Sequence, residues 1–309
     1  MVTRVTTPGN YASVITNLLA AQQRQLEAGT KVATQRNGQN LKDYAQSSEL
    51  ITAMRSVQTR LGVYQEQNKL LADKLQTQDT ALLRVADAAQ SVRQVFAEAL
   101  ASGRVDTLVE DVEAQLRAAA EALNARYGGK YLFAGGQVDT RPVTVTSLAD
   151  LTAGPPIASF FLNDQFKVTA KLDEATTITT GFLADDIGAA LMTAFQAFQA
   201  FNEGPDGPFA GALTPAQQTF LEGQLASWDT IRSDVTNLAA RNGTNQKRLD
   251  TIAADLVSRQ NTLAGMLGKI TDADMAQAAS DLQQAQLSVQ SAAYVFQALQ
   301  QSSLLNVLK

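Results

Sequence analysis

The sequence predicts a mainly α-helical protein in which long coiled-coil rods from both ends of the chain flank a small β-rich insert. Two observations predict this fold class. Apolar residues recur at alternating spacings of four and three over long segments near both ends, which is the period of helices that pack against partner helices. In the middle, short segments rich in Val, Thr and Phe alternate with Gly and Pro breaks, as strands and turns do.

The strongest helical signal begins at Leu50 and ends at Ala99, with no proline in between. The positions of its stripe, apolar apart from Asn68 and Gln78, are Leu50, Met54, Val57, Leu61, Tyr64, Asn68, Leu71, Leu75, Gln78, Leu82, Val85, Ala89, Val92, Phe96 and Ala99. At 1.5 Å per residue this helix is roughly 75–80 Å long and needs partners along its whole length. Ser102-Gly103 should end it, and a shorter antiparallel helix is expected from Leu108.

The N-terminal segment predicts an amphipathic helix after an extended start. Residues 1–13 contain the breaker Pro8-Gly9-Asn10, and Ile15, Leu19 and Leu26 then lie on one helical stripe. Gly29 is expected to interrupt this helix, and residues 29–42 are expected to form a connector.

The middle of the chain predicts five strands followed by a helix at about 184–201. The expected strands are Lys130–Ala134, Pro142–Thr146, Ala158–Leu162, Phe166–Leu172 and Thr176–Phe182.

A second long helix is predicted from the N-cap pair Thr214-Pro215, with a stripe that includes Trp228 and Arg232 and resumes after Gly243. Thr271-Asp272-Ala273-Asp274 should cap a final helix with Leu282, Val289, Phe296 and Leu299 on its apolar side. The terminal helices carry opposite net charges, which favours their association.

We therefore expect three domains. Residues 1–42 and 270–309 form an inner domain of terminal helices, residues 43–129 and 202–269 form the coiled-coil rod, and residues 130–201 form the outer insert.

The composition excludes most enzyme chemistry. The chain has no cysteine and no histidine, so it has no thiolate or imidazole with which to attack a substrate or bind zinc. No cofactor or metal site is predicted, and Asp272, Asp274 and Asp281 lack the glycine and glutamate of a calcium loop. A net charge of −5 argues against a nucleic-acid partner. No segment reads as a membrane span or a secretory signal, so we expect a protein that is either cytosolic or exported without a cleaved peptide.

The heptads alone leave two hypotheses open. They fit a rod that polymerises through its apolar stripes, and they fit a monomeric helical bundle that buries those stripes internally. The low fraction of charged residues, 18%, favours assembly because few charges would need to be desolvated between subunits.

Several stretches resemble the bacterial flagellin superfamily. Leu26–Val32 is similar to the family's "ISSGKRI"-like segment, Asn245–Asp250 to its "xQNRLD" segment, Ile270–Ala276 to its "IxDaDmA" segment, and Gln283–Lys309 to its C-terminal helix. Tyr131–Pro142 resembles the "YLFaGtktdtpPf"-like stretch of the family's hook-associated members at the hook–filament junction. The "P-x-D-D-P/A" connector of the family is absent from residues 36–44.

The resemblance implies a structural subunit of the extracellular flagellum and no enzyme. Copies would self-associate in a ring or short tube and contact other hook-associated proteins and flagellin. The chain would leave the cell by the flagellar type III route without a cleaved signal peptide, with an export chaperone on its C-terminal helix. The expected assembly interface comprises Ile15, Leu19, Leu26, Leu282, Val289, Phe296 and Leu299. The alternatives are flagellin, the main filament subunit, and, more remotely, another type III secreted coiled-coil protein.

Overall fold

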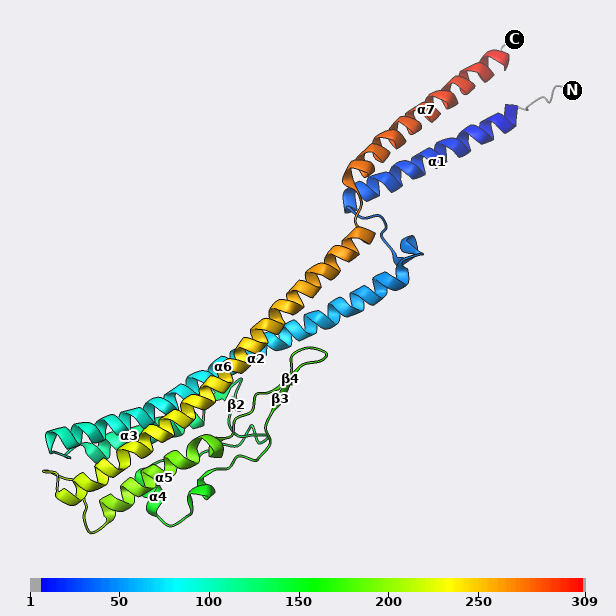
Figure 1. The fold of residues 1–309 in the computed structure, drawn as a ribbon. Coiled ribbons are helices and arrows are strands. Elements are labelled where there is room, and N and C mark those ends of the chain that lie inside the picture. Colours follow the sequence, from blue (N-terminus) through cyan, green and yellow to red (C-terminus); the bar gives the residue numbers. More distant parts are fainter. Residues whose placement is uncertain (1–6, 308–309) are drawn as a thin grey trace. The chain divides into compact units, whose positions relative to one another are not determined.

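The computed structural model describes the backbone of residues 7–307 and the side chains of residues 11–301. Seven helices dominate these residues (Figure 1): α1 (Thr7–Thr34), α2 (Ser48–Ser102), α3 (Leu108–Leu123), α4 (Leu148–Thr152), α5 (Ala184–Glu203), α6 (Pro215–Thr271) and α7 (Met275–Val307). The chain divides into two compact units. The terminal unit is Met1–Arg60 with Ser258–Lys309, and the central unit is Leu61–Val257.

The predicted stripe of α2 lies along the buried side of that helix in the central unit. Leu75, Gln78, Leu82, Val85 and Phe96 are all fully buried, at 0% exposure. Gly103, at φ +67°, ends the helix in the left-handed conformation that glycine adopts without strain. The continuous heptads therefore predicted the end of α2 and its buried face in the central unit correctly, but Leu50 at the start of the stripe is 49% exposed and its neighbour Ile51 is buried instead.

An aromatic cluster forms the core of the central unit between α2, α5 and α6. Trp228 is fully buried, and its ring contacts Phe96 edge-on at 6.1 Å and Phe195 at 5.0 Å between centroids. Phe198 stacks on Phe96 at 5.6 Å. Each ring removes a large apolar area from water, so this cluster ties the two long helices to the helix after the insert.

The insert contains less strand than the sequence predicts. β1 (Arg126–Tyr127) pairs with β2 (Lys130–Tyr131), and β3 (Thr169–Lys171) pairs with β4 (Thr177–Thr179), both antiparallel. The expected strand Ala158–Leu162 is largely the 3-10 helix Ile157–Phe160, and Pro142–Thr146 contributes only the bridge Val143–Phe161.

Side-chain amides on the long helices take the place of the missing strand partners. The amide of Asn68 donates to the Leu172 carbonyl at 2.9 Å, and that of Gln78 donates to the Thr180 carbonyl at 3.3 Å. Because buried backbone carbonyls need a donor, these helix amides let the β3–β4 hairpin sit on α2 without further strands.

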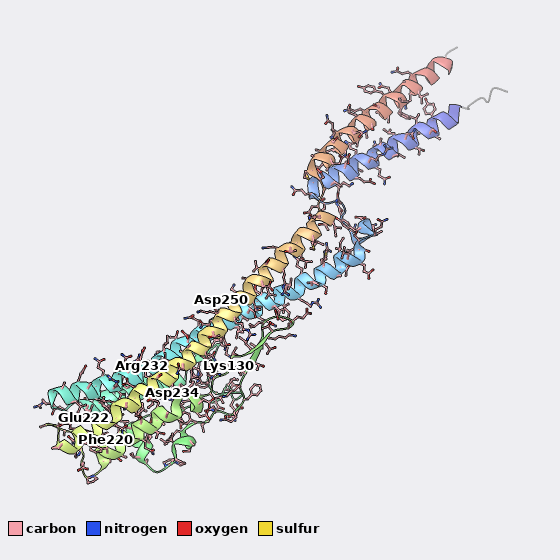
Figure 2. All side chains as sticks on the ribbon, viewed as in Figure 1. Lys130, Phe220, Glu222, Arg232, Asp234 and Asp250 are labelled. Atoms are coloured by element: carbon pink, nitrogen blue, oxygen red, sulfur yellow. The ribbon has the colours of Figure 1, made fainter. Side chains whose placement is uncertain are left out.

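The long helix α6 runs without interruption from Pro215 to Thr271, so the expected break at Gly243 is absent. The predicted cap is confirmed, because the Gln217 N–H donates to the Thr214 hydroxyl at 3.3 Å and Gln217 Oε1 accepts from the Thr214 N–H at 3.1 Å. Arg232, which the sequence placed on the stripe, is exposed on α6 together with Asp234 and Asp250 (Figure 2).

In the terminal unit, α1 already includes Pro8-Gly9-Asn10 and continues through Gly29 to Thr34, so two expectations for this segment were wrong. Proline is tolerated there because the first turn of a helix has no intrahelical use for its N–H. The final helix is capped as predicted, since Asp274 Oδ1 accepts from the N–H groups of Ala276 and Gln277 at 2.9 and 3.2 Å.

Candidate assembly surfaces on the terminal helices

The helices α1 and α7 lie side by side in the terminal unit and pack through what we call the inner seam (Figure 1). Its residues recur at spacings of three and four and are the least exposed of both helices: Tyr11, Val14, Leu18, Ala21, Gln25 and Ala28 on α1, and Ala278, Leu282, Ala285, Val289, Ala292, Phe296 and Leu299 on α7. The Tyr11 ring meets the Phe296 ring edge-on at 6.2 Å, and its hydroxyl donates to the Leu299 carbonyl at 3.0 Å. The sequence missed Tyr11, Val14 and Leu18 because it placed the stripe one residue later.

A second apolar set, which we call the outer row, points away from the inner seam. Its members are Ile15, Leu19 and Leu26 on α1, exposed by 43%, 60% and 72%, and Leu287, Tyr294 and Val295 on α7, exposed by 58%, 73% and 51%. On α1 these residues are four and seven positions apart, so they lie on one stripe, and on α7 Leu287 and Tyr294 are seven apart, with Val295 beside Tyr294. Exposed apolar side chains scattered singly are ordinary, but a stripe of this length is typical of a surface that another molecule covers.

The seven residues expected at the assembly interface therefore fall into two groups. Ile15, Leu19 and Leu26 lie in the outer row, where a second copy could contact them directly. Leu282, Val289, Phe296 and Leu299 lie on the inner seam, opposite α1 of the same chain. The structure brings the second group together and leaves the first group open.

The connector between α1 and α2 is ordered by contacts with the junction between α6 and α7. The Asn37 N–H donates to the Thr271 carbonyl at 2.8 Å, and the Ala273 N–H donates to the Gln35 carbonyl at 2.9 Å. The Tyr44 hydroxyl accepts from the Gly38 N–H at 2.9 Å. These bonds fix the base of the α1–α7 pair.

A carboxylate completes the connector. Asp43 Oδ2 accepts from the N–H groups of Asn40 and Gln39 at 2.9 and 2.8 Å. These bonds stabilise the charged form, so they hold the pKa of Asp43 below its ordinary value of 3.8.

Within residues 7–307, no helix is both long enough and apolar enough to cross a lipid bilayer. In the same part of the chain, no three acidic side chains converge as metal ligands would.

Two long helices, a pair of terminal helices and an exposed apolar row on that pair define a mainly helical protein with a surface that a partner can cover. Two family models identify it further: the bacterial flagellin N-terminal helical region matches residues 5–137, and the bacterial flagellin C-terminal helical region matches residues 225–308. Because the two matches together span well over half of the chain, the protein belongs to the bacterial flagellin family, and it is a structural component of the flagellum.

Two solved structures share this fold. The "putative flagellar hook-associated protein" of Vibrio parahaemolyticus superposes with a TM-score of 0.62 at 16% identity, over 74% of this chain and 100% of that one. Bacillus cereus FlgL superposes with a TM-score of 0.53 at 13% identity, over 71% of this chain and 99% of that one. No curated protein matches the sequence.

Proposed function

We propose that this chain joins the flagellar hook to the filament, with copies packed side by side in a ring or short tube. The outer row carries this proposal, because it exposes apolar side chains on both terminal helices of an isolated chain. Covering them with a neighbouring copy removes that area from water, which is the main driving force of protein association.

In this proposal the expected interface residues act in two ways. Ile15, Leu19 and Leu26 contact a neighbouring copy. Leu282, Val289, Phe296 and Leu299 hold α7 against α1, so that both helices present the outer row in a fixed orientation. Removing either group stops assembly, but only the second also loosens the terminal unit of the single chain.

A junction role, as opposed to a filament role, is supported by what the two structural neighbours are called. One is described as a flagellar hook-associated protein and the other as FlgL, and this chain covers almost the whole length of each. The alternative, that the chain is flagellin itself, is supported by the two family models, which describe the terminal regions of flagellin.

The same proposal gives the chain its partners and route. It would contact other hook-associated proteins on one side and flagellin on the other, and it would leave the cell by the flagellar type III route without a cleaved signal. An export chaperone would cover α7, whose outer-row residues are exposed before assembly. The role is mechanical, with no catalysis and no nucleic-acid or membrane partner.

Seeded assembly tests the proposal. The purified full chain is added separately to isolated hooks and to sheared filament fragments, and the products are imaged by electron microscopy. A cap of one or two layers on hooks without long growth is the expected result. Long filaments would identify a flagellin, and absence of binding to either seed would refute the junction role and the filament role alike.

A further inference from the structure

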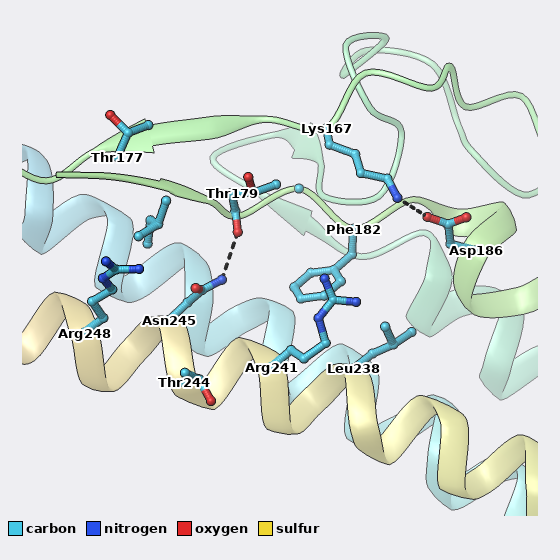
Figure 3. Close-up of a pocket in the computed structure, with 12 residues that line it drawn as sticks. Lys167, Thr177, Thr179, Phe182, Asp186, Leu238, Arg241, Thr244, Asn245 and Arg248 are labelled. Carbon is cyan, nitrogen blue, oxygen red and sulfur yellow. Dashed lines mark hydrogen bonds and ion pairs between the residues drawn. The ribbon is translucent and has the colours of Figure 1, made fainter.

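A cationic groove lies between α6 and the β3–β4 hairpin of the central unit, away from the terminal helices (Figure 3). It encloses about 480 Å³. One wall is α6, with Arg241 and Arg248 two turns apart on the same face, and the other is the hairpin, with Thr177 and Thr179. Asn245 joins the two walls by donating to the Thr179 carbonyl at 2.9 Å.

Two of the three cations in this groove have no acidic partner. Lys167 is paired with Asp186 at 2.8 Å, so that pair contributes no net charge. Arg241 and Arg248 are exposed and form no ion pair with any described residue. Two free guanidinium groups beside hydroxyl and amide groups form a site for carboxylates, which arginine binds through two parallel N–H groups.

Unpaired carboxylates with the same spacing lie on α2. Glu66 and Asp73 are separated by seven residues, as Arg241 and Arg248 are, so each pair spans about 10 Å along its helix. Both carboxylates are exposed and form no ion pair with a described residue, while the exposed Lys69 between them leaves this face with a net negative charge.

One member of the acidic pair, Asp73, lies at the height of the groove along the central unit. The amides of Asn242 and Gln246 on α6 both donate to the carbonyl of Leu75 on α2, at 2.8 and 3.1 Å. Arg241 and Arg248 therefore flank the level of Leu75, and Asp73 lies two residues from it. Copies packed side by side would bring Asp73 of one chain to the height of the groove of the next.

We propose that this groove binds the Glu66–Asp73 face of a neighbouring copy, as a second contact between subunits. The proposal builds on the proposed function, because it requires copies to stand side by side. Acidic residues outnumber basic ones in the central unit as a whole, so two such units repel each other unless cations are placed at the contact. A groove with two free guanidinium groups supplies them and sets the register of the neighbour.

Disulfide trapping tests the occupant directly, because the natural chain has no cysteine. Full-length Arg248→Cys and Asp73→Cys chains are mixed at high concentration without hooks and oxidised. Since each carries one thiol, a disulfide-linked heterodimer forms only between copies, and it is the expected product. Arg241→Cys with Asp73→Cys tests the neighbouring register. An Arg232→Cys chain, exposed on α6 outside the groove, is the matched control and should give no more heterodimer than chance collision.

Charge reversal supplies the second measurement. The double variant Arg241→Glu/Arg248→Glu should reduce capping of hooks about tenfold at low salt, and adding Glu66→Arg/Asp73→Arg in the same chain should restore it. Equal capping by the reversed and natural chains, or a failure of the rescue together with no more cross-linking than the control, overturns the groove contact while leaving the junction role intact. Failure of the natural chain to cap hooks overturns the junction role, and the cross-link in solution still decides the groove.

Discussion

Replacing Leu19 by aspartate tests the role of the outer row in assembly without changing the contacts of the inner seam. The Leu19 side chain is 60% exposed, so a neighbouring copy can cover about three-fifths of it. Full burial of a leucine contributes about 1.5–3 kcal/mol, which gives about 1–2 kcal/mol for this contact. An aspartate loses that term and adds the cost of desolvating a charge, so the concentration needed for assembly should rise at least about tenfold.

The same change should leave the single chain intact. An exposed substitution of this kind alters the free energy of unfolding by about 0.5 kcal/mol or less. Phe296→Asp is the matched comparison, because this ring contacts Tyr11 on the inner seam. It should lower the stability of the α1–α7 pair by about 3 kcal/mol, the lower end of the range for losing a core phenylalanine, and also prevent assembly.

Capping of hooks by electron microscopy and thermal unfolding of the unassembled chain by circular dichroism, run on both variants, provide the assay. Normal capping by Leu19→Asp would refute an outer-row interface. Normal capping by Phe296→Asp or by Val289→Asp would refute the requirement that α7 be held against α1.

Three further outcomes follow from other parts of the molecule. Trp228→Ala should lower the free energy of unfolding of the central unit by about 3–5 kcal/mol, measured by urea denaturation, because it empties the site between Phe96 and Phe195; a loss below 1 kcal/mol, roughly the cost of a surface change, would contradict this core. Gly38→Ala should disorder the connector, since its Cβ would lie 2.5 Å from that of Asp43, and proteolysis near residue 38 should accelerate, whereas Gly62→Ala, with open space around it, should not change it. The contribution of Asp43 to the stability of the connector should be fully present above the ordinary pKa of 3.8 and be lost only as the pH falls through the lower folded pKa, because the folded pKa is depressed. In the Asp43→Asn variant, the NMR amide signals of Gln39 and Asn40 should lack that acid transition. An unchanged transition in the variant would contradict the role of Asp43.

The sequence predicted the rods well because their pattern admits one interpretation. In α2, the residues at spacings of four and three are apolar over many turns, and only one face can be buried. Even the polar members Asn68 and Gln78 proved to be buried, at 1% and 0% exposure, since each donates to a carbonyl of the hairpin or its flank. A continuous heptad thus located buried amides without any knowledge of their partners.

The terminal helix α1 was harder to interpret because it carries two apolar stripes. Leu18 and Leu19 are adjacent, and each continues a row with the right spacing, one through Ala21 and one through Leu26. A sequence with two usable faces does not say which one meets α7 and which one meets another chain. The prediction followed the large side chains, which on α1 lie in the outer row, whereas the buried positions of the inner seam include small residues such as Ala21 and Ala28.

The insert and the groove were missed for a shared reason, which is that both depend on contacts between distant segments. The strands are shorter than predicted because side-chain amides of α2 donate to backbone carbonyls that would otherwise need donors from a neighbouring strand. Arg241 and Arg248 resemble any exposed charges on a long helix until the hairpin is placed above them. The division into three domains remains a prediction alongside the two compact units.

The distribution of large and small side chains connects the fold to assembly. The central unit has a core of stacked aromatic rings, so it is stable without partners. Among the described side chains of the α1–α7 pair, the buried ones are Ala21, Ala28, Ala278 and Ala285, which remove little apolar area from water. Helices paired by so little burial are marginal alone, and in the proposed assembly a neighbouring copy on the outer row would add to their stability. If copies pack through the outer row as proposed, the terminal helices are ordered by their neighbours, which suits a subunit that is exported before it assembles.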